Sequence, residues 1–214
     1  MIRAVVFDMD GVLIEAKDWH YEALNQALGL FGFEISRYDH LTTFDGLPTR
    51  RKLQLLSAEG DLPPALHDFI NEMKQRYTME IVASKCKPRF VHEYALSRLR
   101  AEGYRLAVAS NSIRSTIETM MRQSGLSQYL EFSVSNEDVT KAKPDPEMYN
   151  QAIARLALPP TEVLIVEDNE NGVRAARASG AHLLQVQHVE EVNYTNICRR
   201  IAECNALAAV RAAS

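Results

Sequence analysis

The chain has 214 residues, of which 46% are hydrophobic and 24% charged, and its formal net charge at pH 7 is −4. This composition predicts an ordered globular protein with one core domain, or with a core and a smaller insertion. Because there is no basic block, we expect neither a nucleic acid nor a membrane surface as a partner. Because there is no apolar run of about 18 residues, we expect no membrane-spanning helix. The three cysteines lack metal-site spacing, and the first strand leaves no room for a signal peptide, so we expect a cytoplasmic protein with reduced thiols.

The first predicted element is a strand over residues 2–7, which ends at two carboxylates, Asp8 and Asp10. Its unbroken apolar run is typical of a strand buried on both faces of a parallel sheet. Asp8 and Asp10 then follow the carboxyl end of the strand, where open α/β sheets hold their ligands. Two carboxylates there suit metal binding, nucleophilic attack and proton transfer, and an ordinary polar turn is the alternative.

A long helical segment separates this strand from the next one. From Leu13 to Tyr104 the chain runs 91 residues, which is about 60 more than one strand–helix–strand crossover needs. Three segments repeat apolar residues every three or four positions, as amphipathic helices do: residues 16–31, 53–56 and 66–77. We therefore expect a helical cap domain over residues 15–85, inserted where it can act as a lid.

After the insertion, apolar strands alternate with helical patterns. The predicted strands are residues 106–109, 132–134, 163–166 and 181–186. The predicted helices are residues 90–101, 113–125, 146–158 and 172–180. This alternation is typical of an α/β protein with a doubly wound parallel sheet, a Rossmann-like core, and right-handed crossovers. The core domain is expected to comprise residues 1–14 and 86–214.

Polar residues also follow the later strands. After the second, third and fourth strands they are, in order, Ser110 with Asn111, Lys143, and Glu167 with Asp168. Because the carboxyl ends of parallel strands share one edge of a sheet, we expect these side chains to meet Asp8 and Asp10 there. Each of these polar groups could instead serve only as a helix cap or as an ordinary loop residue. Their common placement at strand ends favours a site.

The expected cluster has a clear electrostatic requirement. Three carboxylates and a phosphate dianion cannot gather unaided, since like charges about 4 Å apart repel by several kcal/mol at intermediate dielectric. Lys143 supplies one positive charge, and Mg²⁺, which prefers carboxylate oxygens, supplies two. Backbone N–H groups around Gly11 and the Ser110 hydroxyl would balance the remainder.

These residues resemble the motifs of the haloacid dehalogenase-like hydrolase superfamily over nearly the full length of the chain. The matching segments are Asp8-Met9-Asp10-Gly11-Val12, Ser110-Asn111, Lys143-Pro144-Asp145-Pro146 and Glu167-Asp168-Asn169-Glu170-Asn171-Gly172. The helical insertion is similar to the α-helical cap subclass of that family. Phosphatases for small phosphorylated metabolites dominate this subclass, which also includes β-phosphoglucomutase.

The resemblance implies a role for each matching residue. Asp8 would be the nucleophile that forms an aspartyl-phosphate, and Asp10 the general acid and then the general base. Ser110 would hold a phosphoryl oxygen, Asn111 would contact the substrate, and Lys143 would neutralise the nucleophile and the phosphoryl group. The implied Mg²⁺ ligands are Asp8, the carbonyl of Asp10, Asp168, and Glu167 directly or through water. Asp10 together with this metal set favours cleavage of a P–O bond.

The cap is expected to contact the substrate through His20, Gly46 and Arg50. His20 is either packed within the cap or helps Asp10 move a proton. A histidine in a matching place occurs in β-phosphoglucomutase, which makes a sugar phosphomutase an alternative, although Asp45 stands where that enzyme has a basic residue. Arg50 either pairs with a second phosphate or a carboxylate, or is solvated.

The predicted function is a Mg²⁺-dependent phosphomonoester hydrolase for a small phosphorylated metabolite, with a sugar phosphate as the best candidate. An Asp-phosphorylated signalling receiver is the alternative from another class, and the inserted helices disfavour it because receivers have only about 120 residues. Residues 190–214 repeat apolar positions at near-helical spacing and are expected to pack on the core, which favours a monomer over an oligomer.

Overall fold

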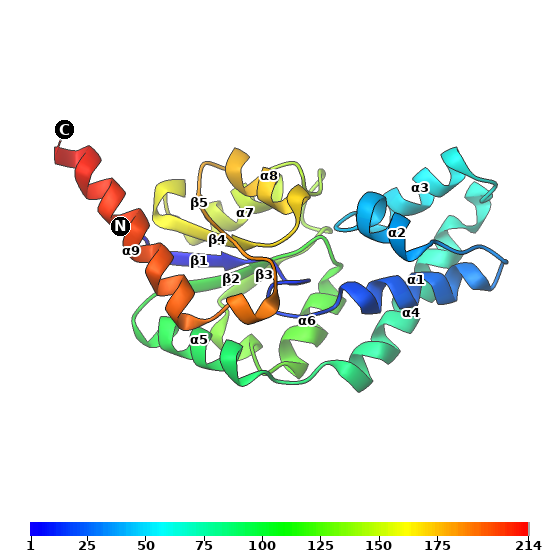
Figure 1. The fold of residues 1–214 in the computed structure, drawn as a ribbon, viewed down its shortest axis with the longest axis horizontal. Helices are drawn as coiled ribbons and strands as arrows, with labels where there is room; N and C mark the ends of the chain where they lie inside the picture. Colours follow the sequence, from blue (N-terminus) through cyan, green and yellow to red (C-terminus); the bar gives the residue numbers. More distant parts are fainter. Residues whose placement is uncertain (214) are drawn as a thin grey trace. The chain divides into compact units, whose positions relative to one another are not determined.

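Five parallel strands form the central sheet of the structure, a computed structural model that describes residues 1–213 and the side chains of residues 1–209. The order β3-β2-β1-β4-β5 (Figure 1) joins β1 (Ala4–Phe7), β2 (Arg105–Ala109), β3 (Phe132–Val134), β4 (Val163–Glu167) and β5 (His182–Gln185). In the centre, Phe7 of β1 is in register with Val108 of β2 and Val166 of β4. All four residues of β1 are buried, as the unbroken apolar run predicts. The parallel α/β core expected from the sequence is confirmed.

Helices cover both faces of this sheet. One face carries α5 (Phe90–Ala101), α6 (Arg114–Gln123) and α9 (Tyr194–Ala213), and the other carries α7 (Glu147–Leu156) and α8 (Glu170–Ala178) (Figure 1). Short 3₁₀ turns lie between them: η3 (Ser127–Tyr129), η4 (Pro160–Glu162) and η5 (Val189–Glu191). Helix α9 contacts α5 and β5, and Arg200 donates to the carbonyl of Leu183 at 2.9 Å. The C-terminal helix therefore packs on the sheet unit.

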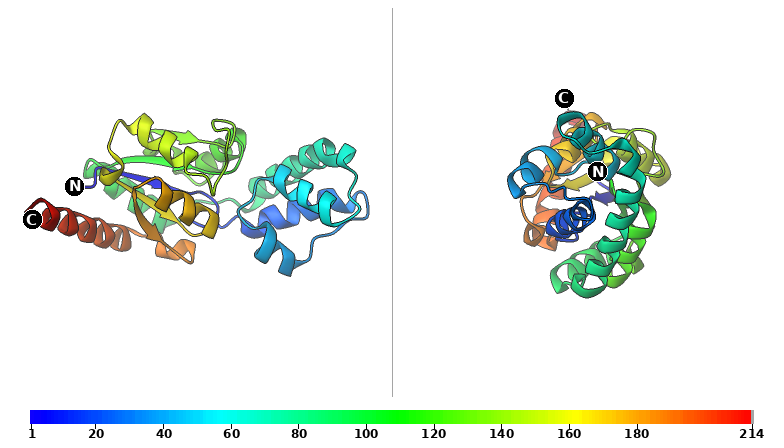
Figure 2. Two further views of the ribbon diagram at one scale, coloured as in Figure 1. Left: turned by 90° about the horizontal axis from the view of Figure 1, so that it is seen from above. Right: turned by 90° about the vertical axis from the view of Figure 1, so that its right-hand side faces the viewer.

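The chain divides into two compact units, of which the first joins Met1–Glu15 to the chain from Lys87 onward and the second is Ala16–Cys86. The second unit contains α1 (Lys17–Gly29), α2 (Arg37–Asp39), the π-helical turn η1 (His40–Phe44), α3 (Thr49–Glu59), η2 (Pro64–Leu66) and α4 (His67–Lys85). Within it, α4 packs along α1 and against α3 in a helical bundle (Figure 2). The bundle buries its own apolar residues, among them Leu24, Leu53 and Ile70.

Element boundaries differ from the sequence expectation where local contacts extend a helix. Helix α8 begins at Glu170 rather than at residue 172, because the Asn169 side chain accepts a hydrogen bond from the Asn171 N–H at 2.9 Å and caps the helix. Helix α4 continues to Lys85, beyond the predicted end at residue 77, and buries Ile81 and Val82 on the way. Among residues 1–213, none of the helices has the length and apolar character that crossing a bilayer requires.

Candidate active site at the strand ends

The carboxyl ends of β1, β2 and β4 bring polar side chains from distant parts of the chain to one edge of the sheet. Asp8 follows β1 directly, and its N–H donates to the carbonyl of Val166 at 3.0 Å, so the pairing with β4 continues to this residue. Ser110 follows β2, and Glu167 is the last residue of β4. Asp8, Ser110 and Glu167 are only 7%, 1% and 1% exposed. Protein partners, rather than solvent, therefore decide how these side chains are held.

Lys143 joins two of these carboxylates. Its Nζ donates to Asp8 Oδ1 at 2.6 Å, to Glu167 Oε2 at 3.1 Å and to the carbonyl of Ala109, the last residue of β2, at 2.9 Å. Burial by itself would lower the pKa of Lys143, but attraction to Asp8 and then to Glu167 outweighs it and raises the pKa. The lysine is therefore charged and in contact with the carboxylate expected to be the nucleophile.

Three carboxylates form a group that can hold a divalent cation. Asp8, Glu167 and Asp168 each offer an oxygen, and these atoms lie within 4.8 Å of one another. Burial, followed by repulsion from Glu167, raises the pKa of Asp8 well above its ordinary value even though Lys143 acts to lower it. The single positive charge of Lys143 does not balance the three carboxylates, and all the groups that could bind a cation here offer oxygen atoms. This donor set fits the expected Mg²⁺.

Tyr149 on α7 is part of this cluster, and the sequence did not single it out. Its hydroxyl donates to Glu167 Oε2 at 2.6 Å and accepts from Lys143 Nζ at 2.8 Å, and the residue is fully buried. Burial, followed by the charge of Glu167, raises the pKa of Tyr149 well above its ordinary value, so the phenol keeps its proton. In the sequence, Tyr149 falls on the apolar stripe of a helix beside Met148 and Ala152, which indicates only a core position.

The loop after β2 holds Asp10 and the backbone of Lys143. Ser112 Oγ donates to Asp10 Oδ2 at 3.0 Å. The Asn111 side chain accepts from the backbone N–H of Lys143 at 3.2 Å, and the Ser110 hydroxyl accepts from the N–H of Ser112 at 3.2 Å. The structure therefore brings Ser112, which was not among the expected site residues, against the predicted general acid.

The same loop does not cap the helix that follows it. The residue before α6 is Ile113, which makes no side-chain cap bond. A carboxylate oxygen of Glu137 accepts from the backbone N–H of Arg114 at 2.7 Å instead. The helix-cap alternative for residues 110–112 is therefore wrong, because a later loop satisfies this N–H.

The three cap residues expected to contact substrate lie in the second unit. His20 Nδ1 is 3.2 Å from Lys74 Nζ. Gly46 has a φ of 71°, a left-handed conformation that favours glycine. Arg50 is largely exposed and lies 3.6 Å from Asp68 in an ion pair at the surface, which agrees with the solvated alternative. The roles of these residues in substrate binding stay predictions.

Two titratable residues of the second unit are buried, and the sequence did not single them out. His40 is 1% exposed and Lys52 is 6% exposed. The His40 ring packs on Tyr21 with its centroid at 4.9 Å, and neither ring nitrogen has a hydrogen-bond partner among the described residues. Burial, followed by the charge of Lys52, lowers the pKa of His40 to about 4. The imidazole is therefore neutral at pH 7.

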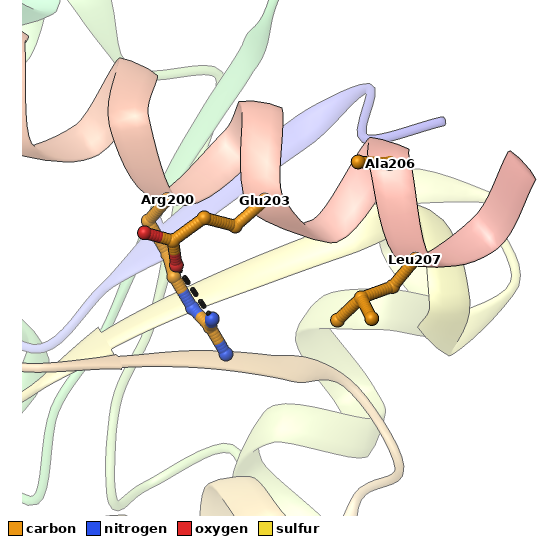
Figure 3. A pocket seen from close by; sticks show the side chains of 4 residues that line it. All are labelled: Arg200, Glu203, Ala206 and Leu207. Atoms are coloured by element: carbon orange, nitrogen blue, oxygen red, sulfur yellow. Dashed lines mark hydrogen bonds and ion pairs between the residues drawn. The ribbon is translucent and has the colours of Figure 1, made fainter. Parts of the chain in front are cut away.

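Figure 3 shows a surface depression on α9 that is lined by Arg200, Glu203, Ala206 and Leu207. On the same helix, Asn205 accepts a hydrogen bond at 2.7 Å from the N–H of Ile2, which precedes β1. This end of α9 therefore lies near the amino end of β1, at the edge of the sheet opposite the carboxylates. None of the candidate site residues lines the depression.

The chain is similar to known proteins over most of its length. A family model described as haloacid dehalogenase-like hydrolase matches residues 5–186. A phosphorylated carbohydrates phosphatase of Thermotoga maritima is 29% identical over 182 residues, which cover 84% of this chain and 82% of that protein. The solved β-phosphoglucomutase of Clostridium difficile has a TM-score of 0.83 at 19% identity and covers 95% of this chain and 98% of its own. CbbY from Rhodobacter sphaeroides, solved with phosphate, has a TM-score of 0.79 at 24% identity over 86% of each chain. The two structural likenesses establish the fold.

Proposed function

Because the chain belongs to the haloacid dehalogenase-like hydrolases, as its motifs predicted, we propose that it is a Mg²⁺-dependent phosphatase for a small phosphorylated metabolite, with sugar phosphates as the best candidates. The observation that carries this proposal is the buried Lys143–Asp8 ion pair at 2.6 Å, beside two further carboxylates able to hold a cation. Phosphoryl transfer depends mainly on positioning and on charge stabilisation, which such a cluster supplies. The similarity to a phosphatase of phosphorylated carbohydrates supports the enzyme class.

In the proposed reaction, a carboxylate oxygen of Asp8 attacks phosphorus, and the ester P–O bond breaks while Asp10 donates a proton to the leaving oxygen. Water then attacks the phosphorus of the Asp8 phosphate, Asp10 takes a proton from that water, and the bond between phosphorus and Asp8 breaks. Lys143 stays charged and offsets the negative charge of Asp8 and of the phosphoryl oxygens in both steps. Held by Asp8, the carbonyl of Asp10, Asp168 and Glu167, Mg²⁺ would supply positive charge next to the phosphoryl group.

The remaining residues have supporting roles in this proposal. Ser110 would donate its hydroxyl to a phosphoryl oxygen, and Asn111 would contact the substrate next to it. In the cap unit, His20, Gly46 and Arg50 would contact the part of the substrate that is not transferred. These assignments follow from the sequence resemblance.

A sugar phosphomutase is the second candidate. The observation that favours it is His20 on the first cap helix, with Lys74 Nζ 3.2 Å from its ring, since such a pair could move a proton during a second transfer. A mutase must keep its phosphorylated carboxylate while the sugar reorients, whereas a phosphatase hydrolyses it. The family match spans the inserted helices as well as the sheet, which favours a hydrolase over a signalling receiver.

Release of inorganic phosphate from a panel of phosphorylated sugars, nucleotides and acids tests the proposal. Asp8→Asn should lower kcat by about a thousandfold or more, as loss of a covalent nucleophile does, whereas Asp61→Asn, the same change at an exposed position, should match the unmodified protein. Chelation by EDTA should abolish turnover, and added Mg²⁺ should restore it. A coupled assay for glucose 6-phosphate formed from β-glucose 1-phosphate distinguishes a mutase. Hydrolysis by Asp8→Asn within about tenfold of the unmodified rate would remove Asp8 from its role.

A further inference from the structure

The ammonium group of Lys143 has more acceptors than protons. Four oxygens surround its Nζ, namely Asp8 Oδ1 at 2.6 Å, the Tyr149 hydroxyl at 2.8 Å, the Ala109 carbonyl at 2.9 Å and Glu167 Oε2 at 3.1 Å. An ammonium group carries three protons and no lone pair, so one of the four contacts must be weak. The longest is the contact with Glu167. The lysine therefore favours Asp8 over the second carboxylate within its reach.

Tyr149 accounts for this preference. Because Lys143 can only donate, the Tyr149 oxygen accepts from it, and the single hydroxyl proton is directed to Glu167 Oε2 at 2.6 Å. Glu167 is 1% exposed and receives its shortest hydrogen bond from Tyr149. The hydroxyl thus stabilises Glu167 without drawing Lys143 away from Asp8. A hydrogen bond to a buried carboxylate is among the stronger ones in proteins.

We infer that Tyr149 is a positioning residue, whose hydroxyl holds Glu167 and thereby keeps Lys143 directed at Asp8. This inference rests on the proposed function. Tyr149 is fully buried and acts through its two neighbours. Without the hydroxyl, Glu167 would compete with Asp8 for the same ammonium group, because both carboxylates lie within its reach. The ligand set for the cation and the charge next to the nucleophile would then change together.

The test variant is Tyr149→Phe, which removes one oxygen and keeps the ring whose centroid lies 4.5 Å from Lys143 Nζ. Its matched control is Tyr104→Phe, the same change at the residue before β2, on the opposite edge of the sheet. We expect Tyr149→Phe to weaken Mg²⁺ binding, measured by titration calorimetry without substrate, and to lower kcat, each by about 10- to 100-fold, as loss of a supporting contact to a metal ligand does. The KM for the substrate should change by less than about twofold at saturating Mg²⁺, since Tyr149 does not touch it. Tyr104→Phe should match the unmodified protein in all three.

A double variant shows whether Tyr149 acts through Glu167. If it does, the double variant Tyr149→Phe with Glu167→Gln should have a Mg²⁺ affinity and a kcat no more than about twofold below those of Glu167→Gln alone, because the two changes disrupt one contact. If the losses in Mg²⁺ affinity and kcat from the two single variants add in the double variant, the inference is overturned. It is also overturned by a Tyr149→Phe variant that melts at a lower temperature while its Mg²⁺ affinity and kcat stay within about twofold of the unmodified values, because that pattern marks a structural role. If the unmodified protein binds Mg²⁺ but hydrolyses nothing on the panel, the proposed function fails, and the calorimetric comparison still decides the role of Tyr149. If the unmodified protein binds no Mg²⁺, both proposals fail.

Discussion

Replacing Gly172 by alanine should destabilise the sheet unit, although the same change in most helices is stabilising. Gly172 lies in the first turn of α8, directly against the carboxylate of Glu167. A Cβ at this position would lie 2.1 Å from Glu167 Cδ and 2.2 and 2.3 Å from its two oxygens. These distances are more than 1 Å shorter than an ordinary contact of 3.4 Å. Either the carboxylate or the helix must therefore move.

Both movements are costly. Displacing Glu167 would break its bonds to the Tyr149 hydroxyl at 2.6 Å and to Lys143 at 3.1 Å, each worth about 1.5–3 kcal/mol because a charged group is involved. Moving α8 would disturb Val173 and Ala176, which are fully buried, at about 1–3 kcal/mol for overpacking. The higher helix propensity of alanine offsets about 1 kcal/mol of this loss of stability. The cheaper movement sets the cost, and because the clash exceeds 1 Å the upper half of the packing range applies. We therefore expect a net loss of about 1–2 kcal/mol, or about 2–8 °C in Tm for a chain of this size.

Calorimetric melting of Gly172→Ala beside Gly29→Ala tests this expectation. Gly29, in the last turn of α1, would have nothing within 4 Å of an added Cβ and has no positive φ, so alanine there should be neutral or stabilise by up to about 1 kcal/mol. Gly172→Ala should also bind Mg²⁺ at least about tenfold more weakly, because the clash moves either Glu167 itself or α8, which begins two residues after Asp168. A Gly172→Ala protein as stable as the unmodified one, with unchanged Mg²⁺ affinity, would refute the reasoning from packing.

Two further predictions concern Ser112 and His40. Ser112→Ala removes the hydroxyl that donates to Asp10 at 3.0 Å. Because a hydrogen bond to a carboxylate is worth about 1.5–3 kcal/mol, kcat should fall by about tenfold or more with KM unchanged. An unchanged kcat would show that Asp10 does not need this contact. The folded-state pKa of His40 is about 4, below its ordinary value of 6.5. Between pH 6.5 and pH 4 the unfolded chain therefore binds a proton that the folded protein does not, and the free energy of unfolding falls as the pH drops. Below about pH 4 this contribution levels off, because both states are protonated. Urea unfolding should lose about 2–3 kcal/mol from this residue between pH 7 and pH 4. The variant His40→Phe, which keeps an aromatic ring beside Tyr21, should lack this part of the loss, and equal pH slopes for the two proteins would contradict the assignment.

Much of the fold follows from local patterns in the sequence. Unbroken apolar runs mark β1, β2 and β4 because these strands are almost wholly buried. The shorter β3 contains a serine, and only Val134 of its three residues is buried. The predicted positions of all four strands agree with the observed ones to within two residues. The helical insertion is recognisable because its apolar residues repeat every three or four positions. The proximity of Asp8, Ser110 and Glu167 also follows, since parallel strands end at one edge of the sheet wherever their residues stand in the chain.

Only the tertiary structure decided which polar groups touch one another. Tyr149 has the spacing of a core residue, yet its hydroxyl joins Lys143 and Glu167, because the packing of α7 on the sheet sets where that hydroxyl points. Residues 110–112 do not cap α6, because Glu137, from the loop after β3, accepts the hydrogen bond from the Arg114 N–H instead. Periodicity and residue type determine strands, helices and the edge where ligands bind. Hydrogen bonds require atoms to meet within a few tenths of an ångström, and only the packing of whole elements fixes positions that closely.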